Sequence, residues 1–262
     1  ADQFGKSVVF GAFKSATIEI GDQVLSNPIS PNAVCFLAKF KPGGSLDWVT
    51  TMGNGQWGYG TLGDIATVLG TGNVATDAAG NVYITANYHK AMINIGSHTF
   101  TNTDPTGTTN DIFLAKYDAG GGLVWAKSMG GSGSDEAYGL TVTPAGDIYM
   151  AGVFGSPALA FGPDLITNSS SGKVAFIARF DNDGHPTWAS SSGGAGKEYA
   201  VGLAADLSNN VYLTGGLKDK NISFGGTTIT NSGTTSVLYL VKFDPDNHVS
   251  WYKTIVSAID TG

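Results

Sequence analysis

Cysteine, basic residues and long apolar runs are all scarce in this sequence. Of its 262 residues one is a cysteine, Cys35, and 14 are Lys or Arg. A single cysteine excludes an intramolecular disulfide and a cysteine-rich metal site. The net charge of −7 argues against nucleic acid and against anionic membrane surfaces, because both bind basic faces. No apolar run reaches the roughly 18–20 residues of a membrane span, so we expect no membrane insertion.

The motifs of common enzyme classes are missing as well. The sequence has no nucleophile elbow and no HExxH zinc motif. Its GGSGSDE segment is rich in glycine but lacks the lysine and the helix that phosphate binding needs. The sequence therefore predicts a protein that is not an enzyme and has no cofactor.

What the chain does contain is a repeat. Trp125, Trp188 and Trp251 are evenly spaced (188 − 125 = 63; 251 − 188 = 63), and Trp48 lies 77 residues before Trp125 (125 − 48 = 77). An even register of this kind means that one supersecondary unit is used several times. A residue present in every copy is then explained as scaffold, whereas a residue present in one copy is a candidate for function.

Each copy contains four short segments with the alternation of β-strands. In one copy they are GLAAD at 202–206, VYLTG at 211–215, VLYLVKF at 237–243 and a last segment around Trp251. A longer excursion separates the second segment from the third, and no segment has a helical period. A four-stranded meander cannot cover both of its faces alone, so the copies should stack radially. The sequence predicts an all-β fold, a β-propeller of four-stranded antiparallel blades with the small residues innermost and the tryptophans outermost.

One stretch carries a resemblance to a known family. Residues Asp111 to Trp125 (DIFLAKYDAGGGLVW), the following GGSGSDEAYG, and GDIYMAG after a further strand resemble the bacterial SBBP repeat, named for a seven-bladed β-propeller. The resemblance runs through all four copies, which are longer and fewer than in the family. It implies a propeller fold and a place in secreted or surface proteins of bacteria, and it brings no shared catalytic residues.

The positions of the repeats predict a single domain of four blades over residues 1–262, one of them shared between the chain termini. The predicted blades are 34–110, 111–173, 174–236, and 237–262 together with 1–33. One inner strand is missing from this count, which leaves two arrangements open. Either residues 255–262 supply that strand and close the ring, or the slot accepts a strand from a neighbouring molecule and builds a filament.

Four aromatic residues are candidates for ligand binding. Trp57 and Tyr59 lie in a Gly-rich insertion of the first copy, between an outer strand and the next inner strand. Tyr138 and Tyr199 lie in the corresponding connections of later copies. Aromatic residues in such loops stack on sugar rings or anchor protein partners. The alternative for Trp57 is a packing role between blades or in the central channel.

Two turns resemble short calcium loops. Asp181 and Asp183 lie in one of them, and Asp244 and Asp246 occupy the same positions 63 residues later. Carboxylate oxygens in a tight turn suit calcium. The alternative is an ordinary hairpin turn in which the aspartate bonds its own backbone. The second reading is favoured, because the first copy has Lys41-Pro42 at these places.

Together these patterns predict a secreted or cell-surface, non-enzymatic binding or adhesion module for carbohydrate or protein. A second hypothesis is a structural subunit of an extracellular filament or assembly, joined by β-strand addition at the incomplete blade. A third is a carbohydrate-active enzyme, in which carboxylates such as Asp135 and Glu136 act as acid and base.

Overall fold

The computed structural model describes most of the chain, and in the described parts it contains strands and turns but no helix, which confirms the all-β prediction. The chain divides into two compact units, Ala1–Gly130 (unit 1) and Gly131–Gly262 (unit 2). No helix in the described ranges is long and apolar enough to cross a membrane. The described residues are 2–28, 30, 34–52, 74–89, 91–194, 198–218, 221–231 and 236–255.

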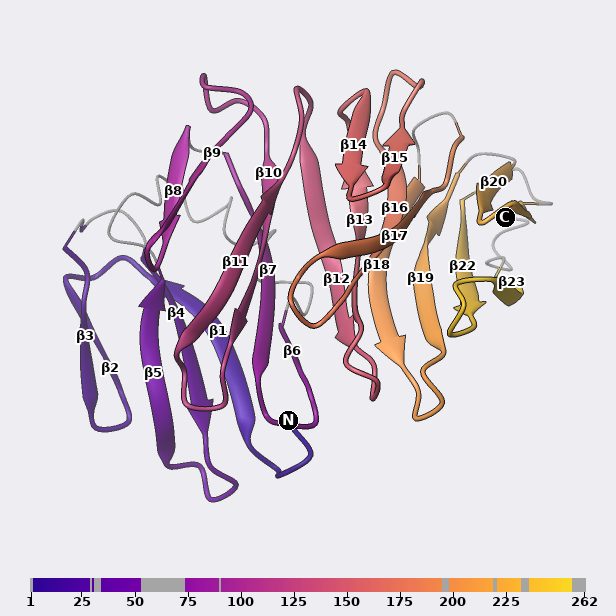
Figure 1. The fold of residues 1–262 in the computed structure, drawn as a ribbon. Helices are drawn as coiled ribbons and strands as arrows, with labels where there is room; N and C mark the ends of the chain where they lie inside the picture. The colour runs from indigo at the N-terminus through magenta and orange to yellow at the C-terminus, as the bar shows by residue number, and fades with distance from the viewer. Residues whose placement is uncertain are drawn as a thin grey trace, which may run out of the picture. The chain divides into compact units, whose positions relative to one another are not determined.

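Unit 1 contains two antiparallel sheets, shown in indigo to magenta in Figure 1. Sheet I has the order β1-β4-β5, with β1 (Ser7–Phe13), β4 (Val34–Phe40) and β5 (Leu46–Met52). Sheet II has the order β6-β7-β10-β11, with β6 (Val74–Thr76), β7 (Val82–Tyr88), β10 (Asp111–Tyr117) and β11 (Leu123–Met129).

Unit 2 contains two four-stranded antiparallel sheets of the same design. Sheet III has the order β12-β13-β16-β17, with β12 (Asp135–Val142), β13 (Ile148–Phe154), β16 (Val174–Phe180) and β17 (Pro186–Ser191). Sheet IV has the order β18-β19-β22-β23, with β18 (Glu198–Ala205), β19 (Val211–Leu217), β22 (Val237–Phe243) and β23 (Val249–Ile255). The four-strand order predicted for a repeat, with the tryptophan-bearing strand at one edge, is therefore confirmed for sheets II, III and IV.

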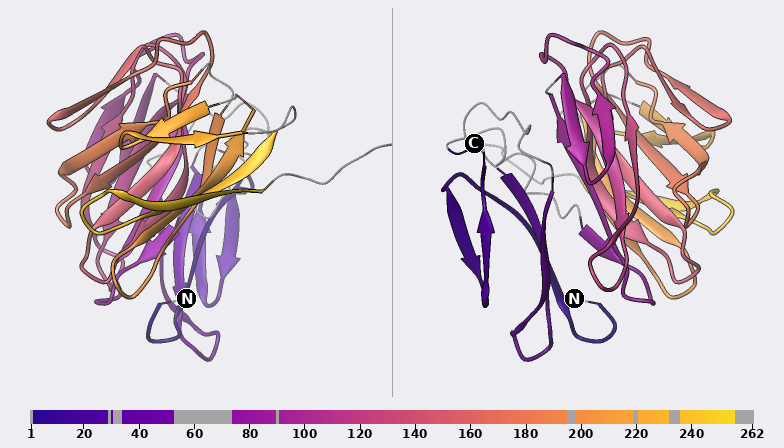
Figure 2. Two further views of the ribbon diagram at one scale, coloured as in Figure 1. Left: turned by 90° about the vertical axis from the view of Figure 1, so that its right-hand side faces the viewer. Right: turned by 60° about the vertical axis from the view of Figure 1, so that its left-hand side comes forward.

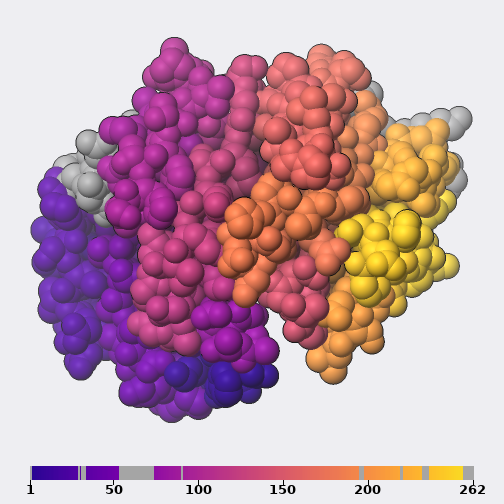
Figure 3. Space-filling view, in the orientation of Figure 1, coloured from indigo at the N-terminus to yellow at the C-terminus, as the bar shows by residue number. Residues whose placement is uncertain are grey.

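The excursion in every repeat is a two-stranded hairpin, a feature that the sequence did not predict. Gly21, Gly96, Gly162 and Gly225 make the hairpin turns with φ between 53° and 63°, a left-handed conformation that glycine adopts without strain. Figure 3 shows the β14-β15 hairpin on the surface beside β17, against which it packs. The four hairpins are β2 (Thr17–Ile20) with β3 (Gln23–Ser26), β8 (Met92–Ile95) with β9 (His98–Thr101), β14 (Ala158–Phe161) with β15 (Asp164–Thr167), and β20 (Asn221–Phe224) with β21 (Thr227–Thr230).

A buried asparagine follows each hairpin, and Asn27, Asn102 and Asn168 tie their hairpins to the parent sheets. The Asn102 side chain donates to the backbone oxygen of Tyr88 at 3.2 Å, at the end of β7. The Asn168 side chain donates in the same way to Phe154 at 3.1 Å, at the end of β13. Buried amides with fitted partners of this kind fix a chain position, which explains why asparagine recurs in the repeat.

The turns between neighbouring strands are held by aspartates at their first position. The Asp206 carboxylate accepts the backbone N–H groups of Ser208 and Asn210 at 2.9 and 3.0 Å. It also accepts the Asn210 side chain at 2.8 Å and the Tyr212 hydroxyl at 3.0 Å. This is the aspartate turn expected from the sequence. The same backbone contacts recur at Asp2, Asp77, Asp118, Asp181 and Asp244.

An NMR titration of the Asp206 carboxylate tests this turn. Hydrogen bonds, the largest from the Asn210 side chain, lower the pKa of Asp206 from 3.8 to about 2. A depressed folded-state pKa stabilises the protein above the unfolded value, and this contribution is lost as the pH falls toward 2. We expect Asn210→Ala to move the titration midpoint upward. An unchanged midpoint near 4 in both proteins would show that the turn does not hold the carboxylate.

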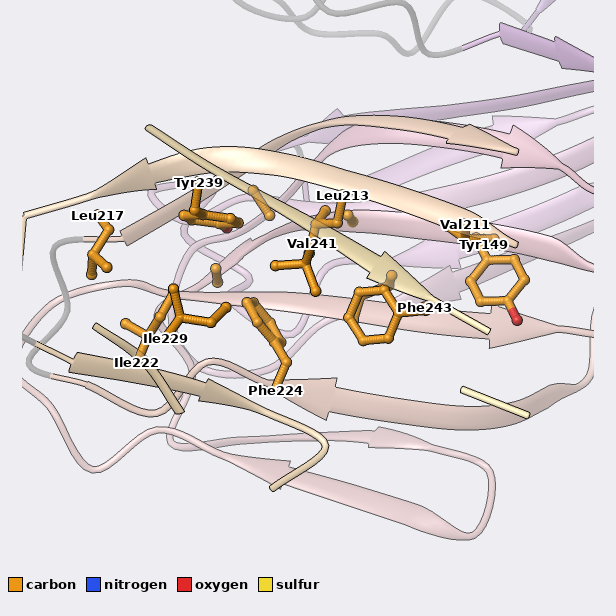
Figure 4. Close-up of a cluster of buried hydrophobic side chains, with 14 of the residues drawn as sticks. Tyr149, Val211, Leu213, Leu217, Ile222, Phe224, Ile229, Tyr239, Val241 and Phe243 are labelled. Atoms are coloured by element: carbon orange, nitrogen blue, oxygen red, sulfur yellow. The ribbon is translucent and has the colours of Figure 1, made fainter. Parts of the chain in front are cut away.

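Within unit 2, sheets III and IV pack face to face. Figure 4 shows Tyr149 of β13 in one cluster with side chains of β19, β22 and the β20-β21 hairpin. At the edge of this core the Trp188 ring meets the Phe243 ring at 5.9 Å in a T-shaped contact. Fully buried members from sheet IV and its hairpin are Ala200, Val211, Leu213, Leu217, Phe224, Ile229, Tyr239, Val241 and Phe243.

Within unit 1, sheet I packs on sheet II in the same way. Cys35, Leu37 and Met52 of sheet I share a core with sheet II residues such as Ile84 and Phe113. Burial raises the pKa of the Cys35 thiol to about 12, so the thiol stays protonated and inert. This agrees with a core role for Cys35.

Sheet I has three strands among the described residues, one fewer than the other sheets of the two units. Its strands correspond to the second, third and fourth strands of those sheets. In the described part of the chain, no strand pairs with the free edge of β1. Most of the segment predicted to close the ring, 256–262, lies outside the described residues, and so closure stays a prediction.

Candidate functional site

The candidate site is the beginning of β12 and β18, the edge strands that come first in sheets III and IV. Both strands carry a β-bulge at the same repeat position, between Ala137 and Gly139 and between Ala200 and Gly202. A bulge leaves one residue outside the ladder and redirects its side chain. The bulged residues are Tyr138 and Val201, so one predicted ligand residue lies where the backbone departs from regular pairing.

Tyr138 belongs to a small polar cluster around Glu136. Lys173 Nζ lies 2.8 Å from Glu136 Oε1, and the Tyr138 hydroxyl donates to Glu136 Oε2. The Ser134 hydroxyl donates to Glu136 Oε1 at 3.4 Å. Burial, and then the hydrogen bond to Glu136, raise the pKa of Tyr138, so its hydroxyl stays a neutral donor. The cluster thus combines an anion and an aromatic ring on β12 with a cation just before β16.

Tyr199 is the most exposed of the predicted ligand residues that the structure describes. Its side chain is 52% exposed, although aromatic residues are usually more buried. Its ring lies against Gly216, where an added Cβ would come within 2.7 Å of a ring carbon. The backbone oxygen of Tyr199 accepts the buried Tyr239 hydroxyl at 2.8 Å. The backbone is thus fixed to the sheet while the ring meets solvent.

The carboxylate that precedes Glu136 has a different role. Asp135 is fully buried and accepts the backbone N–H groups of Gly131, Gly155 and Ser156 at 2.9–3.1 Å. It also accepts the Ser156 hydroxyl at 2.7 Å. Burial raises the pKa of Asp135 despite these bonds. Asp135 therefore holds together two loop segments, and both carboxylates of the proposed acid–base pair are engaged inside the protein.

Two of the predicted ligand residues, Trp57 and Tyr59, lie outside the described residues. The sequence also missed Lys173, whose partner Glu136 is 37 residues away (173 − 136 = 37). The signal that could have found it was its occurrence in one copy, because the positions 63 residues before and after it hold Asn110 and Ser236. Lys173 and Glu136 both differ from the residues at the same positions in the neighbouring copies, so a comparison based on recurring residues did not identify the pair.

The predicted calcium candidates lie in the hairpin turns that join the third and fourth strands. The Asp181 carboxylate accepts the backbone N–H groups of Asp183 and His185 at 2.9 and 2.8 Å, as expected for a hairpin turn. In the equivalent turn, ligand atoms of Asp244, Asp246 and His248 lie within 4.8 Å of one another. The backbone of the turn already uses an Asp244 oxygen, and exposed acidic groups in a turn are common without an ion. The geometry of both turns is thus explained without calcium.

Comparisons with known proteins agree with a repeat architecture. No protein-family model matches the chain, so the resemblance to the SBBP repeat stays a prediction. Over 175 residues the chain is 28% identical to the regulatory protein FlaEY of Caulobacter vibrioides, covering 66% of this chain and 18% of that protein. Over 217 residues it is 25% identical to an uncharacterized WD repeat-containing protein, L264, of Acanthamoeba polyphaga mimivirus, covering 77% and 16%. The chain thus spans less than a fifth of the length of these relatives.

The chain also has a weak likeness to a solved structure, a protein of unknown function from Bacteroides caccae. The sequence identity is 9%, the TM-score is 0.26, and the match covers 84% of this chain and 90% of that one. The relation to a WD-repeat protein and the recurring four-stranded sheets support a repeat-containing, propeller-like fold.

Proposed function

We propose that the chain is a β-propeller-type, non-enzymatic binding module, and that it recognises carbohydrate or protein at the beginning of its innermost strands. One observation carries the proposal. The copies differ at this place in the repeat: Glu136 corresponds to Tyr199, and Tyr138 corresponds to Val201 (136 + 63 = 199; 138 + 63 = 201). Side chains that differ between copies at the same backbone position suit recognition, whereas a scaffold role favours the same residue in every copy.

The residues at this place suit recognition. Tyr199 offers an exposed aromatic ring of the kind that stacks on sugars or fills a pocket of a protein partner. The Lys173–Glu136 pair and the Tyr138 hydroxyl add polar groups for orientation. Trp57 and Tyr59 are proposed to bind the same ligand, because in the sequence they lie in the connection that precedes the first strand of a repeat. An enzymatic role is disfavoured because Asp135 and Glu136 are engaged in internal hydrogen bonds.

The proposed location is the outside of the cell or its surface. The support is compositional, with few basic residues and many small polar ones, together with the resemblance to the SBBP repeat. A second role, as a subunit of an extracellular assembly joined by strand addition, is favoured by one observation. The edge strand β1 carries backbone groups that pair with no described strand on one side, and such edges accept strands from partners.

An array of defined oligosaccharides tests the carbohydrate form of the proposal. We expect the wild-type chain to bind some of them and Tyr199→Ala to weaken that binding about tenfold, as the loss of an aromatic anchor does. Phe4→Ala is the matched control, because Phe4 is 55% exposed, close to the 52% of Tyr199, but belongs to the turn at Asp2 and not to the candidate site. Equal losses in both variants, or cleavage of a bound oligosaccharide, would contradict the proposal.

A further inference from the structure

One face of sheet IV is apolar and exposed. This face, named here the terminal face, is the one turned away from sheet III, and it carries Leu238, Leu240, Lys242, Trp251, Lys253 and Ile255, with Tyr199 at its β18 edge. Leu238 and Ile255 are each 57% exposed and Trp251 is 40% exposed. The left view of Figure 2 brings this sheet toward the viewer. So many large apolar side chains on one face are unusual for a surface without a partner.

The equivalent face of sheet III packs against sheet IV. Ala175, Ile177 and Trp188 occupy the positions of Leu238, Leu240 and Trp251, 63 residues earlier. Ala175 and Ile177 are fully buried, and Trp188 packs against the core that sheet IV completes. The terminal face thus has the residues of a sheet-to-sheet interface.

Hydrogen bonds accompany this packing and define what the partner must offer. In unit 1, Trp48 Nε1 donates to the backbone oxygen of Ala119, in a turn of the next sheet, at 2.9 Å. In unit 2, Arg179 donates to the backbone oxygen of Pro245, in the equivalent turn, at 3.2 Å. Trp251 and Lys242 hold the donor positions on the terminal face. A fitting partner therefore presents an apolar sheet face and a turn carbonyl beside it.

Sheet I presents such a surface. Val9 is 43% exposed, and Phe40 on the same face is partly exposed. Their counterparts in sheet IV, Leu213 and Phe243, are fully buried in the core shared with sheet III. Pro42 stands at the turn position of Pro245. Among the described residues, sheets I and IV thus each have an apolar face with exposed side chains, and the two faces carry the kinds of residue that meet between sheets III and IV.

We infer that the terminal face of sheet IV binds the Val9 face of sheet I in a second copy of this chain. Because the two surfaces differ, the contact is head to tail, and it propagates into a ring or a filament. The contact is between faces and needs no strand addition at β1. Tyr199 lies on the terminal face too, because it pairs with Gly216 and Gly216 pairs with Leu238, so this contact would cover the ring that the proposed function assigns to ligand binding.

Two variants of the full chain test the contact by sedimentation. Trp251→Glu blocks the terminal face and Val9→Glu blocks the opposing face. In the monomer each glutamate would be exposed to solvent, whereas in the contact it would be a buried, unpaired charge. Wild type should form species larger than a monomer that dissociate on dilution, and each variant alone should be a monomer. An equimolar mixture should form a one-to-one dimer, since each variant retains the half that the other lacks.

Val24→Glu is the control, because Val24 is 66% exposed on the β2-β3 hairpin and lies outside both faces. It should assemble as wild type does, and circular dichroism should show that all three variants are folded. A wild-type chain that is monomeric at every concentration would overturn the inference and favour closure within one chain. Assembly that survives Trp251→Glu would overturn it in favour of strand addition, and two variants that fail to pair would overturn the head-to-tail arrangement.

Discussion

Trp188→Ala is expected to lower the free energy of unfolding by about 3 kcal/mol, the lower end of the range for removing a large aromatic side chain from a core. Trp188 is partly buried, and its ring meets the Phe243 ring at 5.9 Å across the boundary between sheets III and IV. Its loss would open a gap in the core that these sheets share. Urea unfolding of wild type and variant, followed by circular dichroism, gives the difference.

The matched control for Trp188→Ala is Trp251→Ala, the same change at the same place of the next repeat. Trp251 is 40% exposed, so its loss is expected to cost less than about 1 kcal/mol when the chain is dilute enough to be monomeric. Equal costs for the two variants would mean that sheet III is not covered by sheet IV in the way described. A cost below about 0.5 kcal/mol for Trp188→Ala would place that ring on the surface.

Lys39→Met is expected to lower the free energy of unfolding by about 3 kcal/mol or more, because it leaves a buried carboxylate without its cation. Lys39 Nζ lies 3.0 Å from Asp2 Oδ2, and both side chains are buried. The same ammonium group donates to the backbone oxygen of Gly80, in a turn of sheet II, at 2.6 Å. The substitution would thus remove an ion pair and a link between two sheets of unit 1.

The pH dependence of the loss identifies Asp2 as its cause. Burial opposes ionisation of Asp2, but the Lys39 side chain and two backbone N–H groups outweigh it, so the pKa is lowered from 3.8. This contribution is present above the unfolded-state pKa and is lost as the pH falls. The difference between wild type and Lys39→Met should therefore shrink below about pH 4.

Lys242→Met is the control, because Lys242 has the same place in the repeat but is partly exposed over the Tyr212 ring. It should cost less than about 1 kcal/mol. A difference between wild type and Lys39→Met that is constant with pH would contradict the role of the ion pair.

The order of strands in each sheet could be predicted because it depends on local patterns. Alternating apolar residues mark the strands, and the aspartate turns fix their ends, as at Asp118 and Asp206. Other features depend on contacts between distant residues. The hairpin strands are four residues long, too short for alternation to reveal, although Gly162 and Gly225 mark their turns in the sequence.

The candidate site was harder to predict than the fold for a physical reason. A repeat reveals what its copies share, whereas a site consists of what they do not share. Tyr199 could be selected as an aromatic residue beside a glycine-rich connection, and the structure describes it as exposed. The internal engagement of Tyr138 could not be predicted, because the bulge at that residue and the Lys173–Glu136 pair arise only in the folded chain.

The central claim is that within each unit the first repeated sheet is covered by the second through the same residues. A crystal structure of the 262-residue chain tests it most directly. The account predicts the Trp188 ring against the Phe243 ring and the Trp48 indole N–H on the backbone oxygen of Ala119. A Trp188 or a Trp48 ring that faces solvent, or sheets III and IV that do not share a core, would contradict it.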